Sequence, residues 1–433
     1  MLDAILYVAG ILVVLVGIAL SIGLHELGHY LPAKIFGVKV KQFMIGFGPT
    51  VKSWQKGETE FGIKAFPLGG YILMSGMFPP EKKPYKGPFA NWIAEARKQE
   101  RAELTAIDND RQFHKLSPWK KMIVMLGGPV MNFFLGMLMI ITALSGIGTM
   151  QQGLTIDQVY QCMEQDAEGN CPVGAPLSPA ALAGFEAGDR VTKVAGQPID
   201  SWAQAIEILN ENPGQGALIE VDRGGEALAL NVTPIFSERA VYDENGQQVF
   251  DPTGNAVTEL RPVIGVLLRP ETKSLSLGES AGFGLDATAS TFGFILTLPQ
   301  QVWDVALSTF GFEERNPNGA VSIVGVGQIA GEVTSADIPI ELKLASLLLL
   351  IGSLNLALFA FNLIPLLPLD GGHVIGAVYE SMKRRLSKVV LKKDPGPIDT
   401  AKALPFAYGM WVVLIVMGLL IMFADLVNPI SLS

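Results

Sequence analysis

Residues 4–24 read AILYVAGILVVLVGIALSIGL, and the pentapeptide HELGH follows them directly as residues 25–29. The first stretch contains no charged residue, and its length suffices for a helix that crosses about 30 Å of hydrocarbon. Ionisable side chains at the end of such a span are costly, so they indicate a functional site. On a helix, His25 and His29 share one face, where both imidazoles can bind one zinc ion while Glu26 acts as a general base.

Three further stretches are long and apolar enough to span a bilayer, and 49% of all residues are apolar. We therefore predict a polytopic membrane protein. A signal peptide is the alternative for the first stretch, but that stretch lacks a basic n-region and a small-residue cleavage site. The four predicted spans are Ala4–Leu24, Met122–Leu144, Leu344–Leu363 and Leu404–Phe423.

Positive charge is concentrated in two of the segments between these spans. Fifteen Lys and Arg fall within residues 39–121 and seven within 383–402, whereas residues 148–337 contain eight against twenty-five Asp and Glu. By the positive-inside rule, the two basic segments are cytoplasmic and the middle segment lies outside, as do both termini. The net charge of −9 argues against nucleic-acid binding.

Two histidines leave a catalytic zinc ion one protein ligand short. Asp370 is the candidate for the third ligand, within residues 362–372, NLIPLLPLDGG, at the end of the third span. The predicted topology runs the first and third spans in the same direction, so the histidines and Asp370 all reach the cytoplasmic end. The alternative is an Asp-Gly turn that only ends a helix. The prolines interrupt helical hydrogen bonding, which favours backbone exposed inside a protein-lined cavity.

The segments outside the spans have signals of their own. The runs Val51–Trp54 and Thr59–Phe66 flank a turn sequence and predict a β-hairpin. The run SPAALAGFEAGDRV at residues 178–191, followed by GQPI at 196–199, resembles a PDZ domain. Ser274–Leu307 is apolar but interrupted by charge, and we expect an amphipathic helix on the outer membrane surface rather than a fifth span.

The two cysteines, Cys162 and Cys171, both fall in the predicted outside segment. A disulfide between them is plausible in that compartment. Two ligands do not make a zinc site, so metal binding by this pair alone is improbable.

The HExxH motif, the pattern N-x-x-P-x-x-P-x-D-G and a PDZ-like module between the second and third spans together resemble the site-2 protease family. These are zinc metalloproteases of regulated intramembrane proteolysis. The resemblance covers nearly the whole chain, and bacterial regulators of envelope-stress sigma factors are the most similar group. Members of that group often carry two tandem PDZ domains, whereas this sequence has room and signature for one. Further matching motifs are FMIGFGP at 43–49, GPVMNF at 128–133 and GVG at 325–327.

The resemblance implies one zinc ion per chain and a role for Glu26 as general base and later proton donor. The predicted hairpin resembles the family's membrane re-entrant β-loop, whose edge would hold an unwound substrate as an added strand. Structural packing is the alternative for the hairpin, as helix packing is for Asn132. His114 and His373 lie outside the motifs, and we do not expect them to bind the metal. The implied zinc ligands are His25, His29 and Asp370, and the implied substrate-binding residues are Asn362, Pro365 and Asn132.

The expected fold class is a polytopic α-helical membrane protein with four transmembrane helices, a membrane-associated β-hairpin and an inserted extracytoplasmic PDZ domain of α+β type. Each expected segment corresponds to one of the features above. The expected segments are residues 1–36, first span with HExxH; 37–118, cytoplasmic or re-entrant β-loop region; 119–147, second span; 150–270, PDZ domain; 274–337, membrane-surface helices; 340–373, third span with the Asp-Gly motif; 374–403, cytoplasmic loop; and 404–427, fourth span.

The function we expect is an endopeptidase in the plasma membrane of a bacterium, with its active site toward the cytoplasm. Its expected substrates are single-span membrane proteins such as anti-sigma factors, and signal-peptide remnants as a further class. A membrane adaptor without enzymatic activity is one alternative. An adaptor would be expected to have lost residues of the HExxH motif, but both histidines and the glutamate are present in this sequence. A zinc transporter is another, but it would need further His or acidic residues within the other spans.

Overall fold

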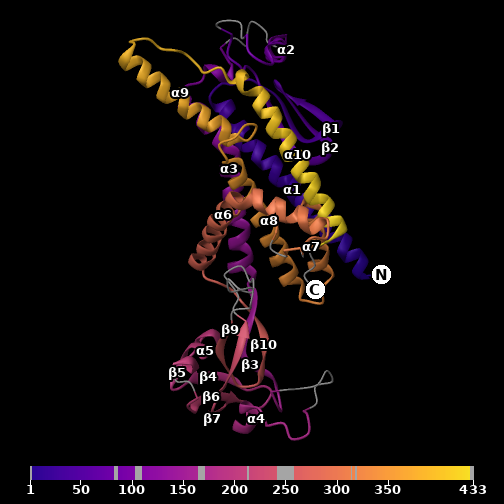
Figure 1. Cartoon of the computed structure of the whole chain (residues 1–433), viewed down its shortest axis with the longest axis vertical. Coiled ribbons are helices and arrows are strands. Elements are labelled where there is room, and N and C mark those ends of the chain that lie inside the picture. The colour runs from indigo at the N-terminus through magenta and orange to yellow at the C-terminus, as the bar shows by residue number, and fades with distance from the viewer. Residues whose placement is uncertain are drawn as a thin grey trace. The chain divides into compact units, whose positions relative to one another are not determined.

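The chain folds into two compact units, shown together in Figure 1. A helical unit comprises Met1–Ile147 and Leu275–Ser433, and the inserted unit comprises Gly148–Ser274. The structure, a computed structural model, describes residues 2–81, 86–102, 110–163, 171–211, 214–240, 258–313, 315–316 and 319–429.

Five helices of the described chain are long and apolar enough to cross a membrane, against the four that we expected. The chain is therefore a helical membrane protein with β-structure, as predicted in outline. The additional helix is α6 (Leu277–Thr309), which is continuous over 33 residues and contains Pro299. The other four are α1 (Leu2–Ile35), α3 (Pro118–Ile141, extended by the π-helix η3, Thr142–Ile147), α8 (Ile340–Asn362) and α10 (Leu404–Val427).

Contacts between α1, α3 and α8 fix the directions in which these helices run. α1 and α8 are parallel, since contacts advance along both chains together, whereas α3 is antiparallel to both. Small residues allow α1 and α3 to approach closely, because a Cβ on Gly28 would lie 2.2 Å from the Gly127 carbonyl oxygen. The contacts that define the directions are Gly17 with Ile351, Ser21 with Asn355, His29 with Val124, and His25 with Asn132.

The hairpin is longer than predicted and consists of β1 (Val40–Lys56) and β2 (Thr59–Met74), which pair antiparallel. Each strand is folded back on itself. The first half of β1 pairs with the start of β2 on one side and with residues 70–74 on the other, through Val40–Met74 and Ile45–Gly70 among others. Residues 70–74 therefore form an edge of this small sheet.

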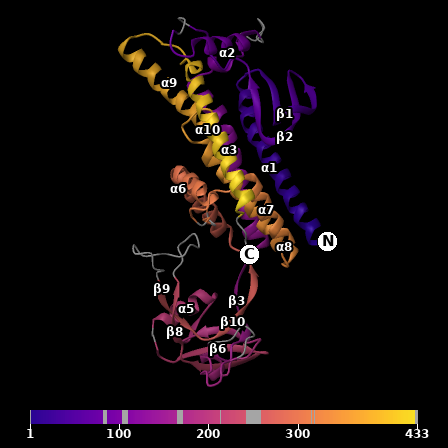
Figure 2. The same ribbon diagram turned by 45° about the vertical axis from the view of Figure 1, so that its right-hand side comes forward.

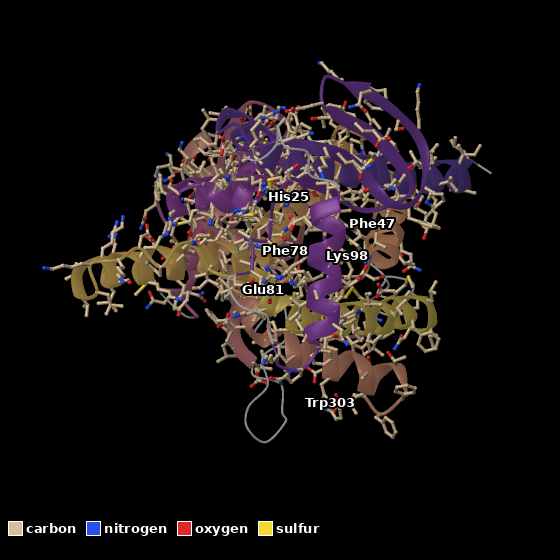
Figure 3. All side chains as sticks on the ribbon, turned by 90° about the horizontal axis from the view of Figure 1, so that it is seen from above. His25, Phe47, Phe78, Glu81, Lys98 and Trp303 are labelled. Atoms are coloured by element: carbon tan, nitrogen blue, oxygen red, sulfur yellow. A yellow bond between two sulfur atoms is a disulfide. The ribbon has the colours of Figure 1, made fainter. Side chains whose placement is uncertain are left out.

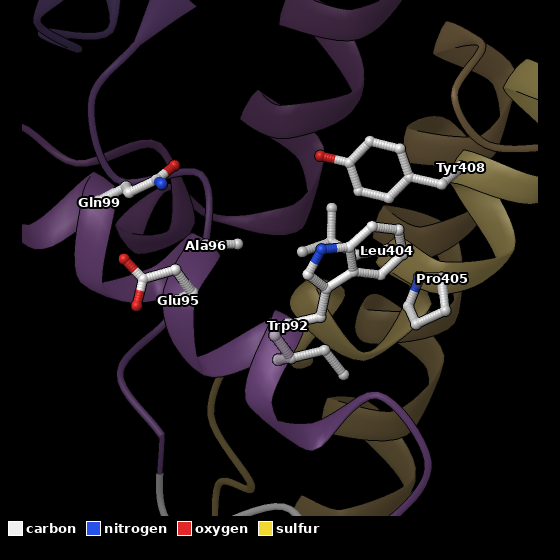
Figure 4. Close-up of a pocket in the computed structure, with 8 residues that line it drawn as sticks. Trp92, Glu95, Ala96, Gln99, Leu404, Pro405 and Tyr408 are labelled. Atoms are coloured by element: carbon white, nitrogen blue, oxygen red, sulfur yellow. The ribbon is translucent and has the colours of Figure 1, made fainter.

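Shorter elements surround the end of the bundle where α1 finishes, as Figure 2 shows. A hollow of about 110 Å³ lies between one of them, α2, and the start of the long helix α10, where the rings of Trp92 and Tyr408 are 5.0 Å apart (Figure 4). At the opposite end, α7 packs antiparallel on the beginning of α1 through contacts such as Thr334 with Leu6. These elements are α2 (Ala90–Ala102), η2 (Phe113–Lys115), α9 (Asp370–Val390), η4 (Thr400–Ala403) and α7 (Ile323–Ser335).

The inserted unit is an α+β fold built on one antiparallel sheet in the order β10-β3-β4-β6-β7, with β5 paired to β4. Its core is aliphatic, and the side chains of Val191, Val194, Ile219 and Val221 are completely buried. A separate hairpin pairs β8 with β9. The elements are β3 (Thr149–Val159), α4 (Pro179–Ala183), β4 (Arg190–Val194), β5 (Gln197–Pro198), α5 (Trp202–Asn210), β6 (Ala217–Arg223), β7 (Glu226–Val232), β8 (Ile235–Ala240), β9 (Thr258–Val263) and β10 (Val266–Lys273).

The run at residues 178–191 forms a compact cap on this sheet. Ser178 accepts a hydrogen bond from the Ala181 N–H and starts α4, and Gly184 ends the helix in the left-handed conformation. Burial raises the pKa of Asp189, but the hydrogen bonds and charge of Arg223 and the hydrogen bond from the Glu186 N–H together lower it overall. This pair ties the cap to strand β6.

The inserted unit contains a disulfide between Cys162 and Cys171. Residues Val241–Val257, whose Asp-, Asn- and Gly-rich sequence predicts an inserted hairpin or loop, lie outside the described residues.

Candidate metal centre

Two histidines from one turn of α1 face the same point. His25 and His29 are four residues apart, and their Nε2 atoms are 3.1 Å apart. His29 is almost completely buried, as is Glu26 between them. Figure 3, a view from above, shows His25 near the middle of the molecule. His25 and His29 face the same point because positions i and i+4 lie on one face of a helix.

Asp370 reaches the same point from the start of α9. The chain leaves α8 at Asn362, passes through the proline-containing loop and begins α9 at Asp370. The two glycines after Asp370 permit this tight return. A Cβ on Gly371 would lie 2.3 Å from the Ile364 carbonyl oxygen, and one on Gly372 would lie 2.5 Å from the Leu367 nitrogen.

The three potential ligand atoms form a triangle of the size that zinc requires. Asp370 Oδ2 lies 3.3 Å from His25 Nε2 and 3.2 Å from His29 Nε2. In a tetrahedral site with bonds of about 2.0–2.1 Å, ligand atoms are separated by about 3.3–3.4 Å. Asp370 Oδ2 is buried and has no hydrogen-bond donor among the described residues. A buried oxygen without a donor, facing two imidazole nitrogens, forms a donor set that could hold a metal ion.

Each imidazole is oriented through its other nitrogen. His29 Nδ1 lies 2.8 Å from the Val124 carbonyl oxygen, which can only accept, so Nδ1 carries the proton and Nε2 keeps its lone pair. His25 Nδ1 lies 3.2 Å from the side-chain amide nitrogen, Nδ2, of Asn132, and the two amide atoms are interchanged by a half-turn of the group. With Oδ1 turned toward the ring, this amide accepts the Nδ1 proton and leaves Nε2 of His25 able to bind a metal. In the opposite orientation, Asn132 Oδ1 is buried without a partner.

A glycine on α3 makes room for the three ligands. A Cβ on Gly128 would lie 2.3 Å from His29 Nε2 and 2.7 Å from His25 Nε2. Any side chain at this position would occupy the point toward which the ligand atoms converge. The GPVMNF run therefore contributes both this gap and, through Asn132, the orientation of His25.

The metal centre opens into a cavity of about 410 Å³. The edge strand at residues 70–74 forms one wall, and it comes close to the general-base candidate, because a Cβ on Gly70 would lie 2.9 Å from Glu26 Cγ. The cavity is lined by His25, Glu26, His29, Gly70, Tyr71, Ile72, Met74, Met77, Met125, Asn362, Pro368, Leu369, Asp370, His373, Trp411 and Leu414.

Two of the expected substrate-binding residues lie elsewhere. Asn132 has no exposed surface and contacts His25, so the expectation that it touches a substrate is corrected to a role in orienting a ligand. Pro365 does not line the cavity, whereas Pro368 does, because the loop folds back at the second proline. Asn362 lines the cavity, and its amide donates to the Leu358 carbonyl.

Sequence reasoning missed other parts of the cavity wall. His373 lies one turn after Asp370 on α9 and lines the cavity, while the three grouped ligands among the described residues do not include it. The expected substrate strand, Val51–Phe66, does not line the cavity either; residues 70–74 do, because β2 continues beyond its predicted end. The short apolar run Tyr71–Met74, which contains the strand formers Tyr71 and Ile72, was the available signal.

Comparison with known proteins agrees with this geometry. The sequence profile of Peptidase family M50 matches residues 13–393. The chain is 29% identical over 433 residues to Zinc metalloprotease Rip1 of Mycobacterium tuberculosis, with 99% of each chain covered. It is also 27% identical over 396 residues to Metalloprotease MmpA of Caulobacter vibrioides, covering 87% of this chain and 88% of that one. The chain belongs to peptidase family M50.

Proposed function

We propose that this chain is an intramembrane zinc endopeptidase that hydrolyses peptide bonds in or next to transmembrane segments of other membrane proteins. The observation that carries the proposal is the convergence of three ligand atoms, 3.1–3.3 Å apart, beside a buried glutamate at the end of an apolar helix. His25, His29 and Asp370 would hold the zinc ion. Bound there, zinc supplies Lewis-acid polarisation of the scissile carbonyl and lowers the pKa of water.

Glu26 is the group that would move protons. Its place next to His25 on α1 and at the cavity wall lets its carboxylate take a proton from the attacking water and return it to the nitrogen of the leaving amine. The polypeptide also excludes bulk water, because Glu26 and His29 are both less than a tenth exposed.

The edge strand at residues 70–74 would hold the substrate. Its backbone is paired to β1 on one side, and within the described residues no strand pairs with its other side. A transmembrane helix must unwind before its peptide bonds can be attacked, and an unwound segment has unpaired N–H and C=O groups. Pairing with an edge strand satisfies those groups inside a site with little water.

The helix directions support four crossings. Because α1 and α8 are parallel and α3 is antiparallel, the chain must cross the bilayer an even number of times between α3 and α8. Both ends of α6 lie at one end of the helical unit, since the Leu275 N–H donates to Leu144 at the end of α3 and Val305 packs on Ala424 at the end of α10. We infer that α6 enters the bilayer and returns, with Pro299 as the natural point of bending.

The inserted unit would act as a PDZ-type gate rather than take part in chemistry. Its chain joins the helical unit after α3 and before α6, at the end opposite to the metal ligands along α3. By the positive-inside rule this end faces outward. A folded module there can exclude substrates with bulky outside domains, or bind a newly made C-terminus. Anti-sigma factors trimmed by another protease are the proposed substrates.

The test of the proposal is cleavage by the purified protein in lipid. It should be incubated with a panel of single-span membrane proteins, and any products should be mapped by mass spectrometry. We expect cuts within or next to transmembrane segments. The matched control is Glu26→Gln, which preserves shape but cannot accept a proton, and which should lower the rate by about 10²–10⁴-fold.

Two outcomes would contradict the proposal. Near-normal turnover by Glu26→Gln would remove this residue from the reaction. Cleavage confined to soluble domains, far from any membrane segment, would contradict the intramembrane assignment. Deleting residues 148–274 tests the gate separately: a filter predicts cleavage of untrimmed substrate, and a receptor predicts slower cleavage of trimmed substrate. Unchanged rates on both substrates would exclude a gating role of the inserted unit but would leave the proposed proteolysis unaffected.

A further inference from the structure

Helix α9 has an apolar stripe that the rest of the protein does not cover. The side chains of the stripe recur at spacings of three and four residues, which places them on one face of the helix. Each is more than half exposed, with exposed fractions of 52–79%. The stripe consists of Ile375, Tyr379, Met382, Leu386, Val389 and Val390.

The opposite face of α9 holds the helix against the protein. Ala377 and Glu380 are buried, and Glu380 accepts hydrogen bonds from Lys121 Nζ at 2.8 and 3.1 Å. Arg384 lies one turn farther on and contacts Glu380 and Asp394. The orientation of α9 is therefore fixed by a buried ion pair, and most of the stripe faces away from the helical unit. Tyr379 lies at the edge of the stripe, where it lines a hollow together with Pro79 and His114.

Basic side chains border the stripe on both sides. At 100° per residue, Lys383 lies about 80° to one side of the stripe and Arg385 about 80° to the other. Neither has an ion-pair partner among the described residues, whereas Lys388, on the far face, lies 3.8 Å from Asp394. An apolar face flanked by cations matches the boundary between acyl chains and anionic headgroups.

The position of α9 in the chain places the helix next to the membrane surface. The helix begins at Asp370, directly after α8, which is apolar enough to span a bilayer. Both Figure 1 and Figure 2 show the far end of α9 projecting away from the other helices. A segment that leaves the bundle at the cytoplasmic end of a span, with this pattern, meets the inner leaflet first.

We propose that α9 docks on the inner leaflet of the bilayer, with the apolar stripe in the acyl boundary and Lys383 and Arg385 on anionic phospholipid headgroups. The occupant of this face is thus lipid and not a second copy of the chain or a protein partner. The proposal requires the cytoplasmic placement of this end but does not require proteolysis, so its failure is distinguishable from failure of the proposed function.

Spin labels at single positions of α9 test the docking. The two native cysteines are joined in a disulfide, so a cysteine introduced by Leu386→Cys or Val389→Cys can be labelled selectively. Lys388→Cys, on the far face of the same helix, is the matched control. The full-length protein should be placed as single copies in nanodiscs of phosphatidylcholine, with and without phosphatidylglycerol.

Spin labels on the two faces of α9 should differ in how often they collide with oxygen and with a water-soluble nickel chelate. Labels at 386 and 389 should collide more with oxygen, which concentrates in acyl chains, and the label at 388 should collide more with a water-soluble nickel chelate. Equal nickel access at all three positions would overturn the proposal. So would protection of 386 and 389 only when discs carry two copies, since a second copy would then be the cover.

The charges are tested by removing them. The double variant Lys383→Gln with Arg385→Gln should weaken immersion of the label at 386 in phosphatidylglycerol discs, by about fivefold in the immersion equilibrium for each charge. Lys388→Gln removes the same charge from the far face and should have little effect. Equal effects of the two changes would show that the flanking positions are not the headgroup contacts. Zinc content confirms that each variant is folded.

Discussion

The helical unit and the inserted unit differ in how many polar side chains they bury. The inserted unit hides its aliphatic residues, and its core contains Val191, Val194, Ile219 and Val221. In α1, by contrast, large apolar side chains such as Leu12 and Leu20 are more than half exposed. The interior of the helical unit contains polar groups beside its apolar clusters. The polar residues that are at most 2% exposed include Ser21, Asn132, Asn355, Glu380 and Asp425.

This difference reflects the two solvents. In water, removing apolar surface drives folding, so the inserted unit needs an aliphatic core. In lipid, apolar side chains gain little from burial, and helices associate through small residues and polar contacts. The interior of the helical unit can therefore hold ionisable groups, such as the paired Lys121 and Glu380 and the three candidate metal ligands. The candidate metal-binding residues of the helical unit therefore lie in its interior, where a water-soluble protein has mostly apolar side chains.

The largest effect on stability should come from cutting back the aliphatic core. Ile219→Ala removes a completely buried side chain and should lower the unfolding free energy of the inserted unit by about 2–5 kcal/mol. Leu12→Ala, the matched change on the outer face of α1, should cost less than about 0.5 kcal/mol. Hydrogen exchange of the full-length protein in nanodiscs measures both. Similar costs at both positions would mean that the two units do not differ in what they bury.

The disulfide should stabilise the inserted unit by a smaller amount. Replacing Cys162 and Cys171 together by serine opens a loop of about ten residues, for which chain entropy predicts a loss of about 2–3 kcal/mol. The loss should be confined to strands of the inserted unit in the same exchange experiment. Faster exchange in α3 or α8 would show instead that the two units unfold together.

Asn132 tests the claim that buried polar groups of the helical unit serve the metal. Asn132→Leu has a similar volume but cannot accept the proton of His25 Nδ1, so zinc affinity should fall about 10–100-fold. Competition with a chelator measures the affinity. Asn355→Leu is the control. It removes a buried amide that donates to Ser21 and to the Ile351 carbonyl, and it should leave zinc affinity unchanged. Equal losses would indicate packing rather than ligand orientation.

The smallest effect should come from a partly exposed ion pair at the hairpin turn, formed by Glu58. Hydrogen bonds from Arg111, followed by those from Lys34, lower the pKa of Glu58 to about 2. A lowered folded-state pKa means that this stabilisation is complete above the unfolded value and is lost as pH falls from about 4.5 toward 2. Glu58→Gln should therefore cost under about 1 kcal/mol at pH 7 and almost nothing near pH 2. A cost that does not change with pH would contradict the assignment.

Sequence alone went far with the metal centre because its signals are local. The HExxH spacing places two ligands on one helical face, and counting spans brings Asp370 to the same end as the histidines. Contacts between distant segments were harder to foresee. Nothing near Asn132 indicates that it faces His25, since that contact depends on how closely α3 packs on α1 through Gly28 and Gly127.

The remaining differences have similar causes. The edge strand at residues 70–74 was missed because glycines there weaken strand propensity, although they are required for the close approach to Glu26. For α6, composition suits both a surface helix and a span, and only the contacts of its two ends argue for a return to the same side. The apolar stripe of α9 was readable in the sequence, but which face the protein covers depends on the Lys121–Glu380 pair.

Zinc content is the most direct test of the central claim, that three side chains from two distant segments form one metal site. The purified wild-type protein should contain one zinc ion per chain, as should Glu26→Gln, because Glu26 is not a ligand. His25→Ala and Asp370→Ala should each lose zinc while the inserted unit keeps its hydrogen-exchange protection. Full zinc occupancy in both of these variants would contradict the account.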